Sequence, residues 1–302
     1  MTTIEIKNVK RTVGRKEILN IDHLEFGEGI NLVLGPNGSG KSTMLKIISG
    51  VLGDFKGEVL IDGKNIREDH IAISKKLGTL IENPSLYRYV TAEDMISFAY
   101  RMKFGRKPAG SDLEGICKKM RLESFLGTRI GNLSSGERKR LSIGIAIVSN
   151  PELLVLDEPE ESVDYSGRKY ITSLIETLYG ERINTVILST HELQYAAEIG
   201  TRAIFLKNGK IALDVEVGRQ NYYLSIRGEQ KSLNSLIQVF PAVNELKTSV
   251  TLNLKNKNDE VDVLTYIREN KLKIDSWKRI SELEYIYLSI YGETSEKGDF
   301  TV

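Results

Sequence analysis

Cysteine is almost absent from this chain: among 302 residues there is one, Cys117. A single thiol excludes a framework of intrachain disulfides and is typical of proteins from a reducing compartment. No apolar stretch approaches the roughly 18 residues that a membrane-spanning helix needs. The first residues also lack a basic region followed by an apolar signal core. We therefore expect a cytoplasmic protein whose membrane role, if it has one, comes through a partner.

An excess of charge of either sign is also missing. Lysine and arginine number 42, aspartate and glutamate 41, and the formal net charge is +1. Nucleic-acid-binding proteins carry a basic surplus, so we expect no nucleic-acid partner. Hydrophobic residues make up 40% and charged residues 27% of the chain, as in an ordinary globular protein. The length suits one large domain with a smaller one, or two medium domains.

Alternating strands and helices are expected over most of the chain. Residues 1–34 alternate apolar and polar positions, which predicts antiparallel strands. Residues 92–150 have a helical pattern with a breaker around Pro108. Two short apolar runs, 153–156 and 185–188, are typical of buried parallel strands. A helical crossover from Tyr165 to Tyr179 connects them, so this part of the chain predicts an α/β fold with a mostly parallel sheet.

The composition changes after about Val217. The order strand, helix, strand, strand, helix, strand then predicts a small α+β domain of the ferredoxin-like kind over 218–292. Its expected segments include the region 246–254 after the first helix and a strand at 273–277. Residues 293–302 are expected to be a disordered tail.

A glycine-rich stretch at 35–43 carries the strongest functional signal. It follows the apolar run 30–34 and precedes the helical pattern at 44–48, which is the strand–loop–helix setting of a phosphate-binding loop. Its glycines allow main-chain N–H groups to converge on phosphate oxygens, and a glycine-rich surface turn is the alternative. The residues of this loop are Gly35, Pro36, Asn37, Gly38, Ser39, Gly40, Lys41, Ser42 and Thr43.

Two further motifs follow in the chain. Asp157 and Glu158 end the apolar run 153–156, which places two carboxylates at the carboxyl end of a strand, where open α/β sheets bind ligands. About twenty residues earlier, Ser134 and Gly136 lie at the expected start of a helix, a place suited to an anion. Taken alone, the carboxylates are an acidic strand cap and the serine is an ordinary helix N-cap with Glu137 three residues on.

These residues together resemble the ATP-binding subunit of an ABC transporter over residues 1–217, with a helical subdomain at about 85–150. Residues 35–43 match Walker A, 133–137 the signature motif and 153–158 Walker B. His191 matches the switch histidine, and Asp164 matches the loop that crosses the dimer interface. The resemblance implies a P-loop cassette with a mixed sheet core, an antiparallel β subdomain and a helical subdomain.

The resemblance also implies a mechanism with ATP and Mg²⁺. Lys41 would neutralise the phosphates, Ser42 and Asp157 would hold Mg²⁺, Glu158 would activate water, and His191 would contact the γ-phosphate. Ser134, Gly136 and Asp164 would act across a head-to-tail dimer formed with a second copy or a paralogous cassette. Separate transmembrane permease subunits would be driven from the inner face of the membrane. The C-terminal pattern is similar to accessory domains of drug- and antibiotic-exporting systems.

Four positions depart from the family pattern. Val13 lies where an aromatic residue usually stacks on adenine, and Ser135 replaces the usual glycine of the signature. Glu82 replaces the glutamine before the helical subdomain, and we expect an acid there still to reach Mg²⁺ or water. With this residue the chain resembles a subgroup of the family tied to peptide and antibiotic resistance. Glu160 and Glu161 stand where small or hydroxylated residues are common, and we expect both to point to solvent.

Two other functions remain alternatives. A soluble ABC ATPase acting on ribosomes or DNA usually has two cassettes or a long coiled coil, and this chain has one cassette and no heptad repeats. A non-hydrolysing regulatory cassette is disfavoured because Glu158 and His191 are present. For a transporter subunit, we expect the membrane partner to dock beside Glu82 and the segment with Tyr87, Tyr89 and Tyr100, tyrosines for which core packing is the alternative role.

Overall fold

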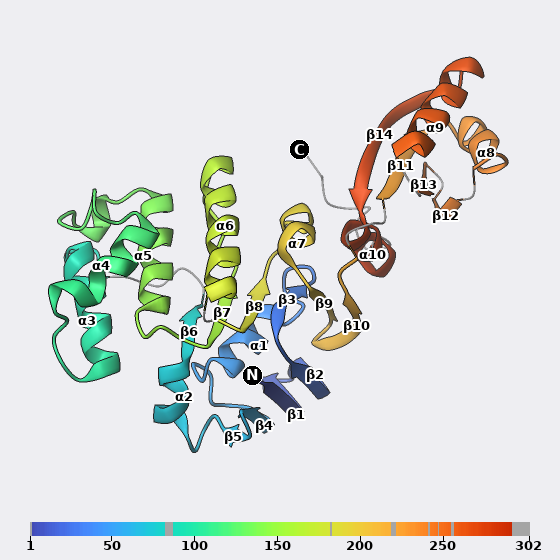
Figure 1. Ribbon diagram of the computed structural model, residues 1–302. Coiled ribbons are helices and arrows are strands. Elements are labelled where there is room, and N and C mark those ends of the chain that lie inside the picture. The colour runs from blue at the N-terminus through green and yellow to red at the C-terminus, as the bar shows by residue number, and fades with distance from the viewer. Residues whose placement is uncertain are drawn as a thin grey trace. The chain divides into compact units, whose positions relative to one another are not determined.

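The structure is a computed structural model of the chain, and it describes residues 2–81, 87–181, 183–218, 222–240, 242–246, 248–254 and 257–291. Contacts between Cα atoms divide the chain into two compact units. The first comprises Met1–His191 and Ile199–Val215, and the second comprises Glu192–Glu198 and Glu216–Val302. Figure 1 follows the chain from the blue strands of the first unit to the orange and red elements of the second.

A six-stranded sheet forms the centre of the first unit. Four of its strands, β3, β7, β8 and β9, are almost continuous runs of buried residues, as expected for strands covered on both faces. β3 pairs in parallel with β8 and β9, and β7 pairs in parallel with β6 and β8, which confirms the parallel arrangement predicted from the sequence. In spatial order the strands are β10 (Lys210–Glu216), β9 (Arg202–Lys207), β3 (Gly29–Leu34), β8 (Thr185–Ser189), β7 (Leu153–Asp157) and β6 (Leu77–Leu80).

A second, antiparallel sheet lies beside this core, as the alternation over the first residues predicts. β1 pairs antiparallel with both β2 and β4, and buried residues alternate with exposed ones along β1. The turn between β1 and β2 contains Gly14 at φ +60°. In spatial order the strands are β2 (Lys16–Phe26), β1 (Ile4–Val13), β4 (Lys56–Ile61) and β5 (Lys64–Asn65).

Helix α1 (Lys41–Ile48) packs between the two sheets. Its residues Met44, Leu45 and Ile48 are fully buried, and they join one hydrophobic cluster with residues of β1, β2 and β4 on one side and of β3, β7 and β8 on the other. The helix is short, so this burial rather than its intrinsic propensity fixes it. Its N-terminus is thereby held at the end of β3.

The remaining helices of the first unit include the helical subdomain, where α3, α4 and α5 gather at one side of the unit (Figure 1). Gly105 ends α3 at φ +70°, and Pro108 follows before α4, as the predicted breaker requires. The helical pattern was expected to continue to residue 150, but residues 121–134 contain only a short 3₁₀ turn. These helices are α2 (His70–Lys76), α3 (Ala92–Phe104), α4 (Gly110–Met120), η1 (Ile130–Asn132), α5 (Ser135–Ile147) and α6 (Tyr165–Glu181). The next helix, α7 (Leu193–Ile199), belongs to the second unit except for its last residue.

The second unit has a four-stranded antiparallel sheet in the order β12, β13, β11, β14, which is the ferredoxin-like topology. Leu224, Ile226, Leu233 and Leu252 belong to its own apolar core. The region 246–254, expected after the first helix, begins at the last residue of β12 and includes all of β13. The elements are β11 (Tyr222–Gly228), α8 (Gln230–Ile237), β12 (Ala242–Leu246), β13 (Ser249–Leu254), α9 (Lys257–Glu269), β14 (Ile274–Ser281) and α10 (Glu282–Tyr291).

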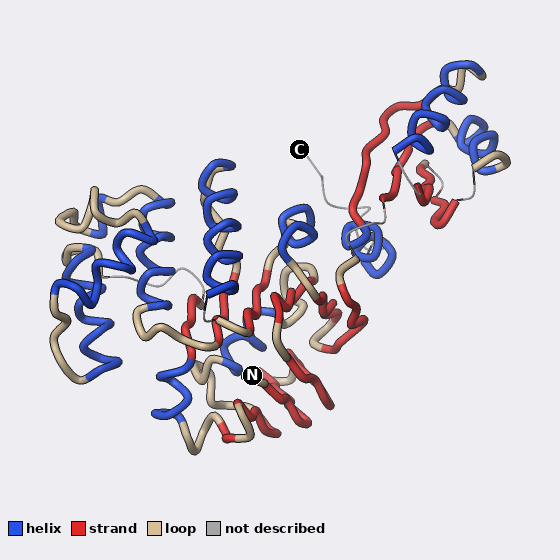
Figure 2. Tube along the Cα trace, in the orientation of Figure 1, coloured by secondary structure: helices blue, strands red, loops and turns tan. Residues whose placement is uncertain are grey.

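Figure 2 colours the helices and strands of both units, and helices accompany each of the sheets. Over the part of the chain that the structure describes, no helix is both long enough and apolar enough to span a membrane. The predicted disordered tail at 293–302 lies outside the described residues.

Candidate functional site

The loop between β3 and α1 has a main chain that only glycine fits. Gly35 and Gly40 have φ values of +150° and +110°. A Cβ atom on Gly35 would lie 2.5 Å from the carbonyl oxygen of Leu206, and one on Gly40 would lie 3.1 Å from that of Ile18. The sequence therefore folds here into a tight turn without side chains, which leaves main-chain N–H groups accessible at the end of the sheet.

Lys41, the first residue of α1, lies across this loop. Its Nζ donates hydrogen bonds to the carbonyl oxygens of Gly35 at 2.8 Å and Pro36 at 3.4 Å. The residue is buried, and this burial lowers the pKa of the ammonium, while the charges of Glu158 and Asp157 act in the opposite direction. A lysine held inside a glycine-rich loop near two carboxylates is positioned to exchange its carbonyl partners for phosphate oxygens.

Two polar features of the loop fit a phosphate group. The Oγ atom of Ser39 is buried and has no hydrogen-bond partner among the described residues. The N-cap of α1 is Gly40, which offers no side chain to the first N–H groups of the helix. The hydroxyl and the N–H groups can both donate to a hydrogen-bond acceptor, and a helix N-terminus favours an anion as that acceptor. Ser42 and Thr43 follow in the first turn, and both are partly exposed.

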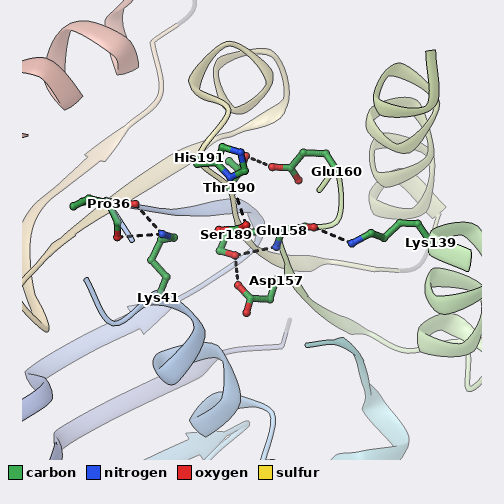
Figure 3. A network of polar contacts seen from close by, with 10 residues as sticks. Pro36, Lys41, Lys139, Asp157, Glu158, Glu160, Ser189, Thr190 and His191 are labelled. Atoms are coloured by element: carbon green, nitrogen blue, oxygen red, sulfur yellow. Dashed lines mark hydrogen bonds and ion pairs between the residues drawn. The ribbon is translucent and has the colours of Figure 1, made fainter. Parts of the chain in front are cut away.

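The predicted carboxylates both lie at the carboxyl end of β7, beside the end of the neighbouring strand β8 (Figure 3). Asp157 ends β7, is buried, and accepts a hydrogen bond from the hydroxyl of Ser189 at the end of β8. Glu158 follows, and its Oε2 lies 3.4 Å from Nδ1 of His191. The side chains of Glu158 and His191 are 21% and 51% exposed, so this acid–imidazole pair is accessible from solvent.

The expectation that Glu160 points to solvent is wrong. Its side chain is turned inward, the residue is 1% exposed, and Oε1 accepts a hydrogen bond from the hydroxyl of Thr190. Oε2 is buried with no hydrogen-bond partner among the described residues. This burial raises the pKa of the Glu160 carboxyl, and the bond from Thr190 only partly offsets the effect. Its neighbour Glu161 is exposed, as predicted.

The signature residues begin helix α5. Ser134 is its N-cap: the hydroxyl accepts a hydrogen bond from the N–H of Glu137 at 3.3 Å, and the Glu137 carboxylate accepts one from the N–H of Ser134 at 2.8 Å. These bonds from Ser134 lower the pKa of Glu137. The capping box that the sequence left as an alternative is therefore present. Ser134 and Ser135 remain exposed, so capping and anion binding are compatible at this helix end.

A pocket of about 440 Å³ adjoins the signature. Asp164 belongs to its wall and is fixed by hydrogen bonds from the N–H of Gly167 at 2.7 Å and the hydroxyl of Ser166 at 3.1 Å, which lower its pKa. In the described structure, no residue of the 35–43 loop and neither Asp157 nor Glu158 lines this pocket. The signature pocket and the glycine-rich loop are therefore distinct features of one chain. The lining residues are Arg121, Ser134, Ser135, Gly136, Glu137, Arg140, Val163, Asp164, Ser166, Gly167, Tyr170 and Ile171.

Other predicted positions have mixed outcomes. Val13 is 55% exposed at the end of β1. Tyr87 and Tyr89 are exposed, whereas Tyr100 is buried in α3, so the docking role suggested for Tyr100 is wrong and its core-packing alternative is correct. Glu82, expected to reach Mg²⁺, lies outside the described residues.

Sequence reasoning missed three residues that contact the acidic residues after β7 (Figure 3). Lys139 bonds to the main chain of Glu158, Ser189 to Asp157, and Thr190 to Glu160. A signal for Lys139 was present. It shares the spacing of the buried face of α5 with Ser142, Ile143 and Ala146, and a lysine in a buried helical stripe requires a partner.

Comparisons with known proteins agree with this geometry. The family model described as ABC transporter matches residues 20–161. The uncharacterized ABC transporter ATP-binding protein YdbJ of Bacillus subtilis is 31% identical over 240 residues, which cover 77% of each chain. The lantibiotic transport ATP-binding protein SrtF of Streptococcus pyogenes is 29% identical over 214 residues, covering 70% of this chain and 90% of SrtF.

Solved structures give the same result. A dimeric bacterial ABC transporter cassette matches with a TM-score of 0.66 and 28% identity, covering 71% of this chain and 99% of the cassette. The same cassette in a dimeric post-hydrolysis state bound to ADP and Pi matches with a TM-score of 0.65 and 27% identity.

Proposed function

This chain belongs to the ABC transporter family as an ATP-binding subunit with ATPase activity, and from that premise we propose that two such chains enclose two Mg-ATP molecules head to tail. In each site, the 35–43 loop of one chain would face Ser134 and Gly136 of the other. The observation that carries the proposal is the separation of the two half-sites within one chain, since the signature pocket contains no residue of the phosphate loop. A second cassette, identical or paralogous, would complete each site.

The roles within each site follow from the chemistry of the side chains. Lys41 would release its loop carbonyls and bind the phosphates, and Ser42 and Asp157 would hold Mg²⁺, which when bound neutralises phosphate charge. Glu158 would orient the attacking water or accept its proton, and its contact with His191 supports this role. His191 would contact the γ-phosphate.

Two residues remain in supporting roles. Asp164, held by the N-terminus of α6, would contact the other cassette across the dimer interface. Glu82 would reach Mg²⁺ or water. Hydrolysis would remove the γ-phosphate that bridges the chains, so the dimer would open, and this ligand-dependent change is the form that an ATP-driven switch takes.

We further propose that the dimer acts at the inner face of the membrane on separate permease subunits, and that the transporter exports drug-, antibiotic- or peptide-like compounds. The similarity to SrtF, named for lantibiotic transport, supports this substrate class. The exposed Tyr87 and Tyr89 supply an apolar surface for the permease. Residues 1–217 would be the cassette and 218–292 an accessory domain with its own apolar core.

Nucleotide binding tests the core of the proposal. Lys41→Ala is expected to weaken binding of a fluorescent ATP analogue at least about tenfold, because a phosphate loses its charge-assisted hydrogen bond. The matched control is Lys103→Ala. Lys103 is also largely enclosed and donates to two carbonyl oxygens, those of Ser74 and Leu77, but it lies outside the site. Equal affinity of the Lys41 variant and the wild-type chain would contradict the proposal.

A further inference from the structure

The main chain of Glu158 has an unusual conformation. Its φ is +45°, in the left-handed region that non-glycine residues rarely adopt. Such strain persists only where surrounding contacts hold it, and it gathers at functional sites. In this conformation the Glu158 carboxylate lies 3.4 Å from Nδ1 of His191. What holds this peptide therefore decides where the carboxylate points.

Two elements hold the peptide from opposite sides (Figure 3). On one side, the N–H of Glu158 donates to the carbonyl oxygen of Ser189 at 3.2 Å and to its hydroxyl at 3.1 Å. On the other side, the carbonyl oxygen of Glu158 accepts a hydrogen bond from Nζ of Lys139 at 3.1 Å. Ser189 ends a strand next to β7, whereas Lys139 comes from α5, the helix that the signature residues begin.

Lys139 is an unusual residue for its position. It is 5% exposed, and fully buried lysines are rare because desolvation of the ammonium is costly. Burial lowers its pKa, while the carboxylates of Glu161, Glu160 and Glu158 act to raise it. A buried methionine or glutamine would fill the same volume at less cost, so a contact specific to the ammonium needs an explanation.

We propose that Lys139 is a positioning residue that ties the signature helix to the main chain of Glu158. Lys139 lies five residues after Ser134, so about one and a half helical turns connect the serine that faces the other chain to the bond on Glu158. A displacement of α5 moves the Lys139 ammonium and, through it, the carbonyl of Glu158. Engagement of Ser134 by a nucleotide on the partner chain would then set the aim of the Glu158 carboxylate.

The proposal rests on the proposed function and adds a requirement to it. Hydrolysis depends on Lys139, whereas binding of ATP to the 35–43 loop does not. A purely structural alternative exists: Lys139 neutralises the buried Glu160, and its loss would only lower stability. The positioning role predicts that loss of Lys139 lowers kcat, whereas the structural role predicts that it lowers only the stability of the fold.

The test compares four variants of the full chain. Lys139→Met keeps the volume and removes the donor. It should lower kcat for ATP hydrolysis about 10- to 100-fold, as expected for a displaced catalytic group, and leave the Kd for a fluorescent ATP analogue within about twofold. Lys139→Arg keeps a donor and should recover part of kcat. Lys103→Met, at a half-buried lysine outside the site, should lower the melting temperature and leave kcat within about twofold.

The fourth variant separates positioning from charge neutralisation. Lys139→Met combined with Glu160→Gln removes both buried ionisable groups, so it should regain melting temperature but not kcat. If Lys139→Met alone does not fold, kcat is measured on this double variant instead. Unchanged kcat in Lys139→Met, or recovery of kcat in the double variant, would overturn the positioning role and leave the proposed function intact. A wild-type chain that binds no ATP would overturn both.

Discussion

Replacing Glu158 by glutamine separates the charge of this side chain from its shape. Glutamine keeps the length of the side chain, and the main-chain bonds from Ser189 and Lys139 do not depend on the carboxylate. The contact of 3.4 Å to His191 can persist as a hydrogen bond. The substitution therefore removes one negative charge and one proton acceptor with little change of packing.

The loss of the proton acceptor sets the expected effect on turnover. A positioned general base contributes about 10²- to 10⁴-fold, which corresponds to roughly 3–5 kcal/mol of barrier. We expect kcat for phosphate release to fall within that range in Glu158→Gln. The control is Glu161→Gln, which removes a charge three residues away from an exposed side chain and should leave kcat within about twofold.

The loss of charge sets the expected effect on binding. The repulsion between a carboxylate and a phosphate charge about 6 Å apart is about 0.7 kcal/mol in water and about 3 kcal/mol at an effective dielectric constant of 20. Because the Glu158 side chain is 21% exposed, the repulsion lies near the lower limit. We therefore expect Glu158→Gln to bind ATP more tightly by about 1 kcal/mol, which is about fivefold.

The assay combines steady-state phosphate release with light scattering in Mg-ATP. The Glu158→Gln chain should bind ATP, form a dimer that persists, and turn over slowly, while Glu161→Gln should resemble the wild type. Wild-type turnover in Glu158→Gln would refute the assignment of Glu158 as the group that activates water. Slow turnover without a lasting dimer would refute the head-to-tail arrangement.

Three further predictions address the loop, the signature and the buried acid. Gly35→Ala, at φ +150° and 2.5 Å from a carbonyl oxygen, should cost at least about 1–3 kcal/mol in urea unfolding and abolish ATP binding. Ser134→Ala should cost about 1 kcal/mol by loss of the N-cap, whereas Ser134→Asp should keep the cap and the melting temperature but prevent ATP-dependent dimers in light scattering. Because the pKa of Glu160 is raised, the folded state retains a proton that the unfolded state loses above about pH 4.5, and wild-type stability falls as pH rises through the folded pKa. Glu160→Gln should remove that fall, as measured by urea unfolding from pH 5 to 8. Parallel stability curves for the variant and the wild type would contradict the burial effect.

Features that depend on local sequence could be predicted. The glycines at 35, 38 and 40 all have positive φ, and the strand, loop and helix around them follow from apolar runs on either side. The short runs at 153–156 and 185–188 became adjacent parallel strands, so Asp157 and His191 lie at the same edge of the sheet. Alternation also gave the ferredoxin-like order of the second unit. In each case the pattern and its physical cause lie within a few residues.

Features that depend on distant neighbours could not be predicted. Glu160 turns inward because Thr190, thirty residues later in the chain, supplies a hydroxyl inside the unit. The donor on Glu158 comes from Lys139, nineteen residues earlier, and only its place in a buried stripe distinguished it. Residues 121–134 contain apolar residues at helical spacing, yet they form turns because main-chain bonds such as Leu122 N–H to Cys117 O close the end of α4 instead.

The charges around the site explain why a nucleotide would need a partner there. Three carboxylates, those of Asp157, Glu158 and Glu160, lie near two ammonium groups, those of Lys41 and Lys139, so the protein alone offers no cationic surplus to a triphosphate. Part of the attraction must come from uncharged donors, the N–H groups of the glycine loop and of helix N-termini. One such N-terminus belongs to α1, and the exposed N-terminus of α5 adjoins the signature pocket. In the proposed dimer, a second chain would supply the donors that this chain lacks around its own nucleotide. Binding and dimerisation are then one electrostatic event, and the bond from Lys139 would extend that event to the carboxylate that acts on water.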